Sequence, residues 1–277
     1  MRGGTRPNTL AFEAFHIAAV VAFQRGRLHK AKLWGKRGRE FCEATTGMDL
    51  QDVDLFGHHD GRVCCKVFEA MSLLLQKSPE APAALDRMLH FLHDKRDATS
   101  EYVGRGYQAL YHILAENFDE AHHSLATFTA DSHTGHWWDF VCLLRECAHI
   151  GRLWKSPPAG PVGKKLPDRI GRLKSSRWKI DEYRIVWDSF HGVALELAQN
   201  TQEASKVFEQ LFARLPHSEE QFFQPQACRF IAWFERRRQN DAAARRAIDY
   251  GLTVAREMQA QLFIDRLQAL ALTDFVI

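Results

Sequence analysis

The amino-acid sequence predicts an all-α protein built from pairs of antiparallel helices. Apolar residues recur three or four positions apart over many segments, which is the spacing of one face of an α-helix. No segment alternates apolar and polar residues as a half-buried strand does. Short breaks with glycine, proline, asparagine or serine separate the helical segments, so neighbouring helices are expected to fold back as hairpins.

The first hairpin is expected near the N-terminus. Residues 10–24 predict a helix, because Phe12 and Phe23 belong to one broad apolar face. Gly26, between two arginines, ends this helix, and Leu28 starts the next. The first two elements are therefore two helices joined by a tight turn.

The following boundaries rest on glycines and capping residues. Gly35 and Gly38 are expected to weaken the second helix, since glycine is a poor helix former and bulky residues would suit these positions. Residues 47–61 carry acids and glycines without a helical period and predict a loop. Ser78 as N-cap and Pro79 in the first helical position predict the start of another helix.

Two polar signals place the later helices. Glu116 and Asn117 separate one pair, and Ser218 with Gln221 resembles a capping box at the start of a helix. About twelve helices are expected in all, over residues 10–24, from 28, 62–76, 80–95, 100–115, 118–130, 135–153, 180–198, 201–215, 219–237, 240–257 and 259–273.

The stretch 155–179 interrupts this pattern. It contains four prolines, three glycines and eight basic residues against one acid, and is not expected to form regular structure. We therefore expect an N-terminal helical lobe over 1–154, a basic loop or joint over 155–179, and a C-terminal helical-repeat lobe over 180–277.

Residues 187–216 resemble a tetratricopeptide repeat. The resemblance rests on small residues where two helices approach, on large apolar residues along the second helix, and on a closing proline. These positions are Gly192, Leu195, Ala204, Phe208, Leu211 and Pro216. The anchors Ala31, Ala121 and Ala204 do not follow a period of 34, so the fold class expected is an irregular, tetratricopeptide-like, α-solenoid-like array.

Composition narrows the function classes. The formal net charge is only +3, so no global field requires nucleic acid or an anionic membrane as partner. Six cysteines without a Cys-x-x-Cys pair predict free thiols in a reducing cytosol. The apolar run from Ile17 to Phe23 is far shorter than the roughly 20 residues that span a bilayer. We expect a cytoplasmic protein that needs no cofactor.

Aromatic and basic residues are the candidates for partner binding. Trp137 and Trp138 are adjacent on a predicted helix and cannot both face one core, and large aromatics are frequent anchors of interfaces. The basic stretch and its edges, together with an arginine strip later in the chain, are the other candidates. The full set is His136, Trp137, Trp138, Trp154, Lys164, Lys165, Trp178 and Arg237. A nucleic-acid role for this stretch is the less favoured interpretation.

A metal-dependent helical enzyme is an alternative. Glu120 with His123, and Glu146 with His149, have the i, i+3 spacing of helical di-iron sites. Two further sets have ligand-type or acid–base residues, and each is more simply a solvated surface group. They are His90, His93 and Asp94 with Asp131, His133 and His136, and the loop group Asp52, Asp54, His58, His59 and Asp60. No metal is assigned.

The middle of the chain resembles an all-helical family of bacterial immunity proteins of polymorphic-toxin systems, the immunity protein forty-nine family. The landmarks are Gly135-His136-Trp137, Arg145-Glu146, Arg152, Asp181-Glu182-Tyr183, Trp187 and the closing Ala269-Leu270-Ala271-Leu272. The basic, proline-rich insertion departs from that family. The resemblance implies a cytoplasmic, non-catalytic protein that binds one cognate toxin and blocks its active site.

The sequence therefore favours a non-catalytic helical-repeat module that binds a protein, most concretely a toxin inhibitor of the immunity type. A generic tetratricopeptide-like scaffold is the first alternative, and the metal-dependent helical enzyme is the second. The absence of a nucleophile elbow, a phosphate-binding loop and a His-Glu-x-x-His motif favours the binding functions.

Overall fold

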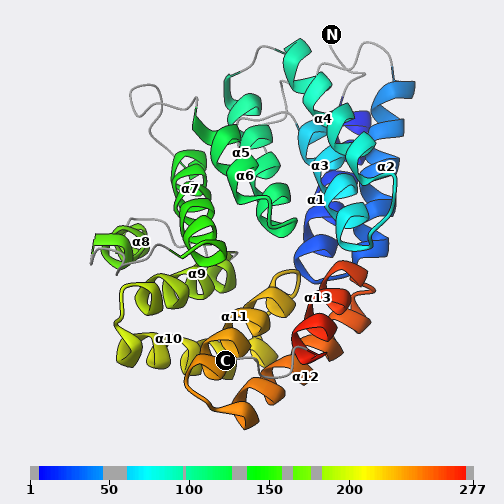
Figure 1. Cartoon of the computed structure of the whole chain (residues 1–277). Helices are drawn as coiled ribbons and strands as arrows, with labels where there is room; N and C mark the ends of the chain where they lie inside the picture. The colour runs from blue at the N-terminus through cyan, green and yellow to red at the C-terminus, as the bar shows by residue number, and fades with distance from the viewer. Residues whose placement is uncertain are drawn as a thin grey trace.

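The computed structural model describes residues 6–45, 61–95, 98–126, 136–157, 165–175 and 183–272 (Figure 1). These ranges hold thirteen α-helices, one short 3-10 helix and no strand, which confirms the all-α prediction. The helices are α1 (Arg6–Gln24), α2 (Leu28–Ala44), α3 (Gly61–Leu75), α4 (Ala81–Lys95), α5 (Ala98–Leu114), α6 (Phe118–Ala126), α7 (His136–Lys155), α8 (Lys165–Ser175), α9 (Arg184–Leu197), α10 (Thr201–Arg214), η3 (Leu215–His217), α11 (Gln224–Arg237), α12 (Asp241–Glu257) and α13 (Gln261–Leu272).

The helices form six successive pairs, from α1 with α2 to α11 with α12, followed by α13. The first helix of each pair packs against its own partner and against the first helix of the next pair. Each second helix also contacts the following first helix. This repeated packing agrees with the irregular helical-hairpin array that the sequence predicts.

Glycine permits helices to approach closely at two contacts, one between α9 and α10 and one between α2 and α3. A Cβ atom on Gly192 would lie 2.6 Å from Phe208 Cζ, so this glycine lets α9 and α10 approach closely, as predicted. A Cβ atom on Gly35 would lie 2.6 Å from the carbonyl oxygen of Cys65. Gly35 and Gly38 are thus packing positions between α2 and α3, and a bulky residue would not fit there.

A ring of aromatic side chains joins the first helices of the pairs. Six aromatic rings, each within 6.2 Å of the next between centroids, close into a circle in the core. In order they are Phe23, Phe68, Tyr107, Phe140, Tyr183 and Phe222, from α1, α3, α5, α7 and the segments that precede α9 and α11. The first helices of the pairs therefore share one core.

The array closes on itself instead of remaining open. The carbonyl oxygen of Gln24 accepts hydrogen bonds from the backbone N–H groups of Gln221 (2.7 Å) and Phe222 (3.3 Å). Lys77 Nζ lies 2.6 Å from Asp265 Oδ2, which links the α3–α4 turn to α13. Figure 1 accordingly shows α13 next to the bundle of α1, α2 and α3.

The stretch 155–179 differs from its prediction. The expectation of no regular structure is wrong over Lys165–Ser175, which form α8. Pro167 is tolerated because it lies in the first helical turn, where backbone N–H groups have no intrahelical acceptor. Leu166 and Ile170 are buried and hold the helix against the core.

The position of α8 bears on the predicted division of the chain into two lobes. Because α8 packs against α7 and α9, the basic stretch lies inside the fourth helical pair. Buried residues before and after this stretch belong to one hydrophobic cluster. The division into the lobes 1–154 and 180–277 stays a prediction.

The start of α11 also differs from its prediction. The helix begins at Gln224 and not at 219, with Pro225 in its first turn. Ser218 Oγ accepts a hydrogen bond from the N–H of Glu220 (3.1 Å), but these residues form a turn and not the expected capping box. The segment is held by other parts of the chain: the N–H of Gln221 donates to the carbonyl oxygen of Gln24 (2.7 Å), and the Glu220 carboxylate accepts the N–H of Ile185 (2.9 Å).

Candidate functional site

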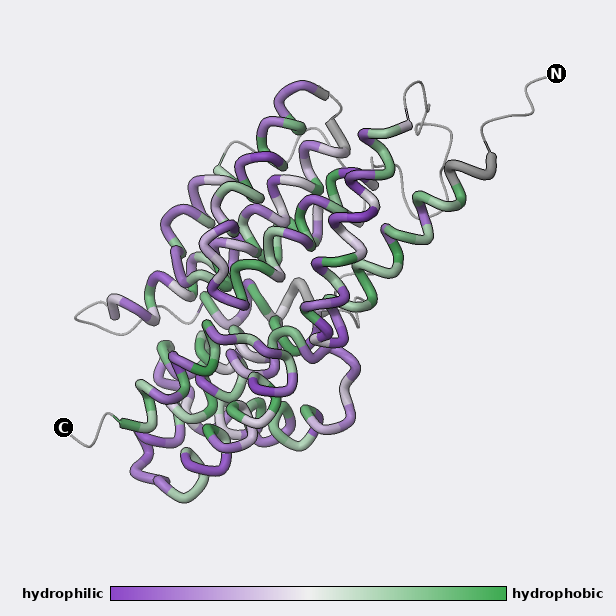
Figure 2. The backbone as a smooth tube through the Cα atoms, turned by 90° about the vertical axis from the view of Figure 1, so that its right-hand side faces the viewer, coloured by the Kyte–Doolittle hydropathy of each residue, from purple (hydrophilic) through white to green (hydrophobic). Residues whose placement is uncertain are grey.

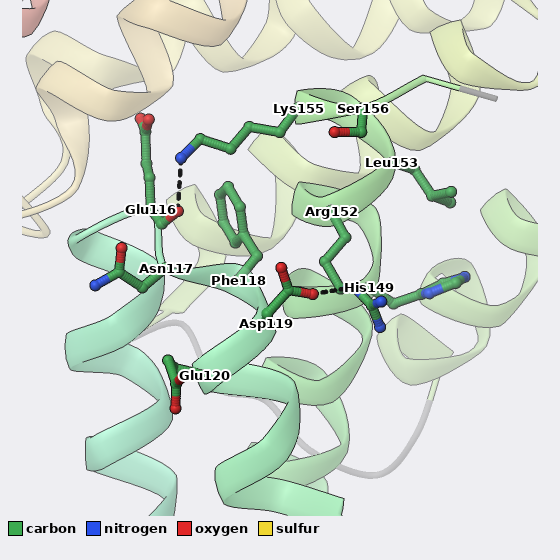
Figure 3. Close-up of a pocket in the computed structure, with 10 residues that line it drawn as sticks. All are labelled: Glu116, Asn117, Phe118, Asp119, Glu120, His149, Arg152, Leu153, Lys155 and Ser156. Atoms are coloured by element: carbon green, nitrogen blue, oxygen red, sulfur yellow. Dashed lines mark hydrogen bonds and ion pairs between the residues drawn. The ribbon is translucent and has the colours of Figure 1, made fainter.

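A polar hollow of about 620 Å³ lies between the α5–α6 turn and the last turns of α7 (Figure 3). Its walls come from two segments, Glu116, Asn117, Phe118, Asp119 and Glu120 on one side, and His149, Arg152, Leu153, Lys155 and Ser156 on the other. Arg152 Nε lies 2.7 Å from Asp119 Oδ1, and Lys155 Nζ donates to the carbonyl oxygen of Glu116 (2.9 Å). These two contacts fix the segments relative to each other.

Glu116 at the edge of this hollow connects three distant parts of the chain. Its carboxylate is buried and forms ion pairs with Arg229 on α11 and Arg266 on α13, the latter at 3.6 Å. Gln226 Nε2 donates to the same carboxylate (3.2 Å). Glu116 therefore stabilises the contact between the α5–α6 turn and the C-terminal helices.

The two arginines around Glu116 are themselves largely desolvated. Burial lowers the pKa of Arg266 to about 10, and burial with repulsion from Arg266 lowers the pKa of Arg229 to about 10. Arg266 also donates to the carbonyl oxygen of Leu114 (2.6 Å). Two guanidinium groups share one carboxylate, so the cluster depends on Glu116 keeping its charge.

A partly buried aromatic surface adjoins the hollow. The ring of Trp154 lies 6.5 Å from that of Phe118, which lines the hollow, and 6.3 Å from that of Trp233 on α11. Arg229 lies over the ring of Trp154 (5.2 Å) and Arg237 over the ring of Trp233 (5.4 Å). We call Trp154, Trp233, Arg229 and Arg237 the tryptophan surface.

Two polar groups of the tryptophan surface have different surroundings. Arg237 Nε lies 3.1 Å from Glu196 Oε1, so the guanidinium is held in place while its side chain remains 57% exposed. The Nε1–H of Trp154 is buried and has no hydrogen-bond acceptor among the described residues. A surface with fixed arginine and tryptophan side chains suits binding, because little side-chain entropy is lost.

The structure brings together two of the eight residues predicted to bind a partner, Trp154 and Arg237. Trp138 lies near the other end of α7, with Arg145 over its ring at 5.9 Å. Lys165 is exposed at the start of α8. The side chains of His136 and Trp137 and the whole of Lys164 and Trp178 lie outside the described residues.

The residues of the metal alternative are not gathered into a ligand set in the described part of the chain. Glu146 forms an ion pair with Arg169 of α8, while Glu120 and His123 are exposed. Burial lowers the pKa of His149, against the attraction of Glu146. His90 and His93 also belong to no group of three potential ligands there, and the groups at 52–60 and 131–136 lie outside the described side chains.

Glu116 and its partners are members of the site that the sequence does not predict. Its residues are far apart in the chain, as Glu116 and Arg229 are separated by 113 positions. The sequence offers no local signal for such a pair. The two tryptophans were accessible to sequence reasoning only as aromatic residues near helix ends.

The described helices include none that is long and apolar enough to cross a membrane. Comparison of the chain with protein-family models, with curated proteins and with solved structures finds no match.

Proposed function

We propose that this protein is a non-catalytic helical-repeat module that binds a protein partner, and that the partner is a bacterial toxin that it inhibits. The observation that carries the proposal is the tryptophan surface beside the polar hollow. Tryptophan and arginine are the residues that most often dominate binding energy at interfaces. Here Trp154 and Trp233 are partly buried and Arg237 is exposed, and the three lie close together and are held by neighbouring side chains.

The surroundings of the tryptophan surface support binding of a folded protein. The hollow carries acids and bases in pairs, such as Asp119 with Arg152, which suit the polar rim of an interface. The helical pairs beneath share one packed core, so the surface is expected to change little on binding. An inhibitor that captures one partner tightly benefits from this preorganisation.

The assignment of the partner as a toxin rests on the resemblance to the immunity family. Several of its landmarks lie on α7 or at α9, next to the hollow or in contact with the helices that form it. Arg152 lines the hollow, and Trp187 donates from Nε1 to the carbonyl oxygen of Ile170 on α8 (3.2 Å). The landmark residues thus serve both as packing and as surface groups.

The test is co-expression with the products of the neighbouring genes, in search of a toxin, followed by titration calorimetry of the purified pair. We expect Arg237→Glu to weaken binding by about tenfold or more, since it reverses a charge held in the tryptophan surface. Arg37→Glu is the matched control, because Arg37 also lies over a tryptophan, Trp34, at 5.1 Å on α2.

Four outcomes separate the alternatives. Protection of cells by the wild type and its loss with Arg237→Glu alone would support the proposal. Equal effects of both substitutions would contradict the tryptophan surface as the binding site. Binding of an extended peptide in place of a folded toxin would favour a generic scaffold, and loss of a stoichiometric metal with activity in Glu146→Ala would favour the enzyme.

A further inference from the structure

Helix α1 carries an apolar stripe on its solvent-facing side. Leu10, Ile17 and Val21 are 59%, 36% and 39% exposed, and Ala14 between them is also exposed. Their spacing of four, three and four residues is that of the a and d positions in a coiled coil. Figure 2 shows this helix in hydrophobic green over most of its length. The stripe extends along α1 for about 17 Å at 1.5 Å per residue.

The two ionisable residues in the middle of α1 face the protein interior instead. Glu13 and His16 are buried and lie 3.0 Å apart between Oε2 and Nδ1. Between residues 10 and 23 these are the only ionisable side chains, so the outward side of this segment carries no charge. A surface helix normally has the opposite arrangement, and an uncharged apolar face of this kind indicates an interaction surface.

The stripe continues into a basic cleft of about 500 Å³. Val21 lines this cleft together with Arg25, Arg184, Arg214 and His217. Glu219 and Glu220, from the segment after η3, also line the cleft. An apolar stripe and a cluster of guanidinium groups therefore form one continuous surface.

The carboxylates near the cleft do not cancel its positive charge. Arg25 is paired with Glu219 (2.9 Å), while Arg184 and Arg214 both pair with the buried Asp188. Glu220 is fully buried and directed to the backbone of α9, and burial raises its pKa well above the usual range. Asp188 and Glu220 are buried, so the exposed face of the cleft carries three partly exposed guanidinium groups and one exposed carboxylate, that of Glu219, which favours an anionic ligand.

We propose that α1 and the basic cleft bind an amphipathic helix of a partner protein, with its apolar side on the stripe and its carboxylates in the cleft. The carboxylates belong at the N-terminal end of that helix. Acids stabilise a helix N-terminus, and an antiparallel helix would place this end beside Arg25 at the C-terminal end of α1. The inference rests on the proposed function only in that the partner is a protein.

Charge distinguishes this occupant from a second copy of the chain. In an antiparallel pair of α1 helices, the cleft of one copy would face the Leu10 end of the other. The described residues of α1 offer no exposed carboxylate there, because Glu13 is buried. Two copies would therefore bring no further carboxylate from the described part of α1 to the cleft.

The experiment uses two synthetic, fluorescently labelled helical peptides with the same leucine seam. One carries three glutamates and the other three lysines at the N-terminal end, and binding to the full chain is measured by fluorescence anisotropy. We expect the glutamate peptide to bind at least tenfold more tightly, and Ile17→Glu to abolish binding. Arg25→Glu should reverse the preference between the peptides. Leu272→Glu, at another exposed leucine, is the matched control.

The following results would overturn the inference. Equal affinity for both peptides, or binding unchanged by Ile17→Glu, would exclude this surface. A dimer in sedimentation velocity that Ile17→Glu dissociates would assign the stripe to a second copy, and binding to anionic vesicles that the same change abolishes would assign it to a membrane. Arg237→Glu should leave peptide binding intact, so failure here is distinguishable from failure of the proposed toxin binding.

Discussion

At the scale of single residues, the buried cluster of His16, Glu13 and Cys64 links the protonation of a histidine to the stability of the fold. Burial alone would lower the pKa of His16, but contacts with Cys64 and Glu13 outweigh it and raise the pKa to about 10. The imidazole of His16 is therefore protonated in the folded protein at neutral pH. In the unfolded chain its pKa returns to about 6.5.

This difference predicts a loss of stability at alkaline pH. A histidine whose pKa is raised on folding stabilises fully below pH 6.5, and this contribution disappears as the pH rises through 10. We expect the free energy of unfolding to fall by on the order of 1 kcal/mol per pH unit between these limits. Urea unfolding at several pH values measures it.

His16→Gln is the control for this prediction. Burial also raises the pKa of the Cys65 and Cys147 thiols, which makes stability fall with pH in the same direction. Only the part of the slope that disappears in His16→Gln belongs to the histidine. An identical slope in the wild type and the variant would refute the assignment.

At the scale of elements, the turns between helices share one backbone device. Six turns have a residue with positive φ just after a helix, and its N–H and the next N–H bond back to carbonyls three and five residues earlier. These residues are Gly26, Lys77, Glu116, Gln199, Gln239 and Gln259. Five of them are not glycine and carry some strain, because a left-handed backbone disfavours a side chain.

Replacing Gln199 by glycine should therefore stabilise the protein. Gln199 has φ 61° in the α9–α10 turn, and glycine adopts this conformation without strain. We expect an increase of about 1 kcal/mol in the free energy of unfolding, measured by urea titration. Gln199→Val should lower it. A neutral or destabilising Gln199→Gly would show that the turn is not strained.

The turns also show which helices and helix boundaries the sequence could predict. The sequence predicts the α1–α2 turn from Gly26 and the α9–α10 pair from Gly192 and Phe208, because these signals are local. The sequence does not predict α8, because Pro167 and the basic residues around it are typical of a loop. The burial of Leu166 and Ile170 that stabilises α8 depends on other helices and has no local signature.

At the scale of the whole molecule, closure of the array determines which residues meet. The tryptophan surface combines α7 with α11, and the basic cleft combines α1 with α9 and the segment after α10. Sequence reasoning identified Trp154 and Arg237 separately, but could not predict their proximity. Contacts such as Glu116 with Arg266 arise only when the C-terminal helices reach the N-terminal half.

Glu116→Gln tests the contribution of closure to stability. The substitution leaves Arg229 and Arg266, whose side chains are only 21% and 15% exposed, without their carboxylate, and we expect a loss of about 3 kcal/mol in the free energy of unfolding. Glu120→Gln, at an exposed acid of the same hollow, should change it little. Equal losses in the two variants, compared by thermal and urea unfolding, would contradict the role of Glu116.

Above all, we propose that the protein acts by binding a partner through the tryptophan surface. Hydrogen–deuterium exchange of the chain alone and in complex with the co-expressed toxin tests this claim most directly. We predict that the toxin slows exchange at the end of α7, around Trp154, and on α11, around Trp233. Slowed exchange confined to other helices, with none at these two segments, would contradict it.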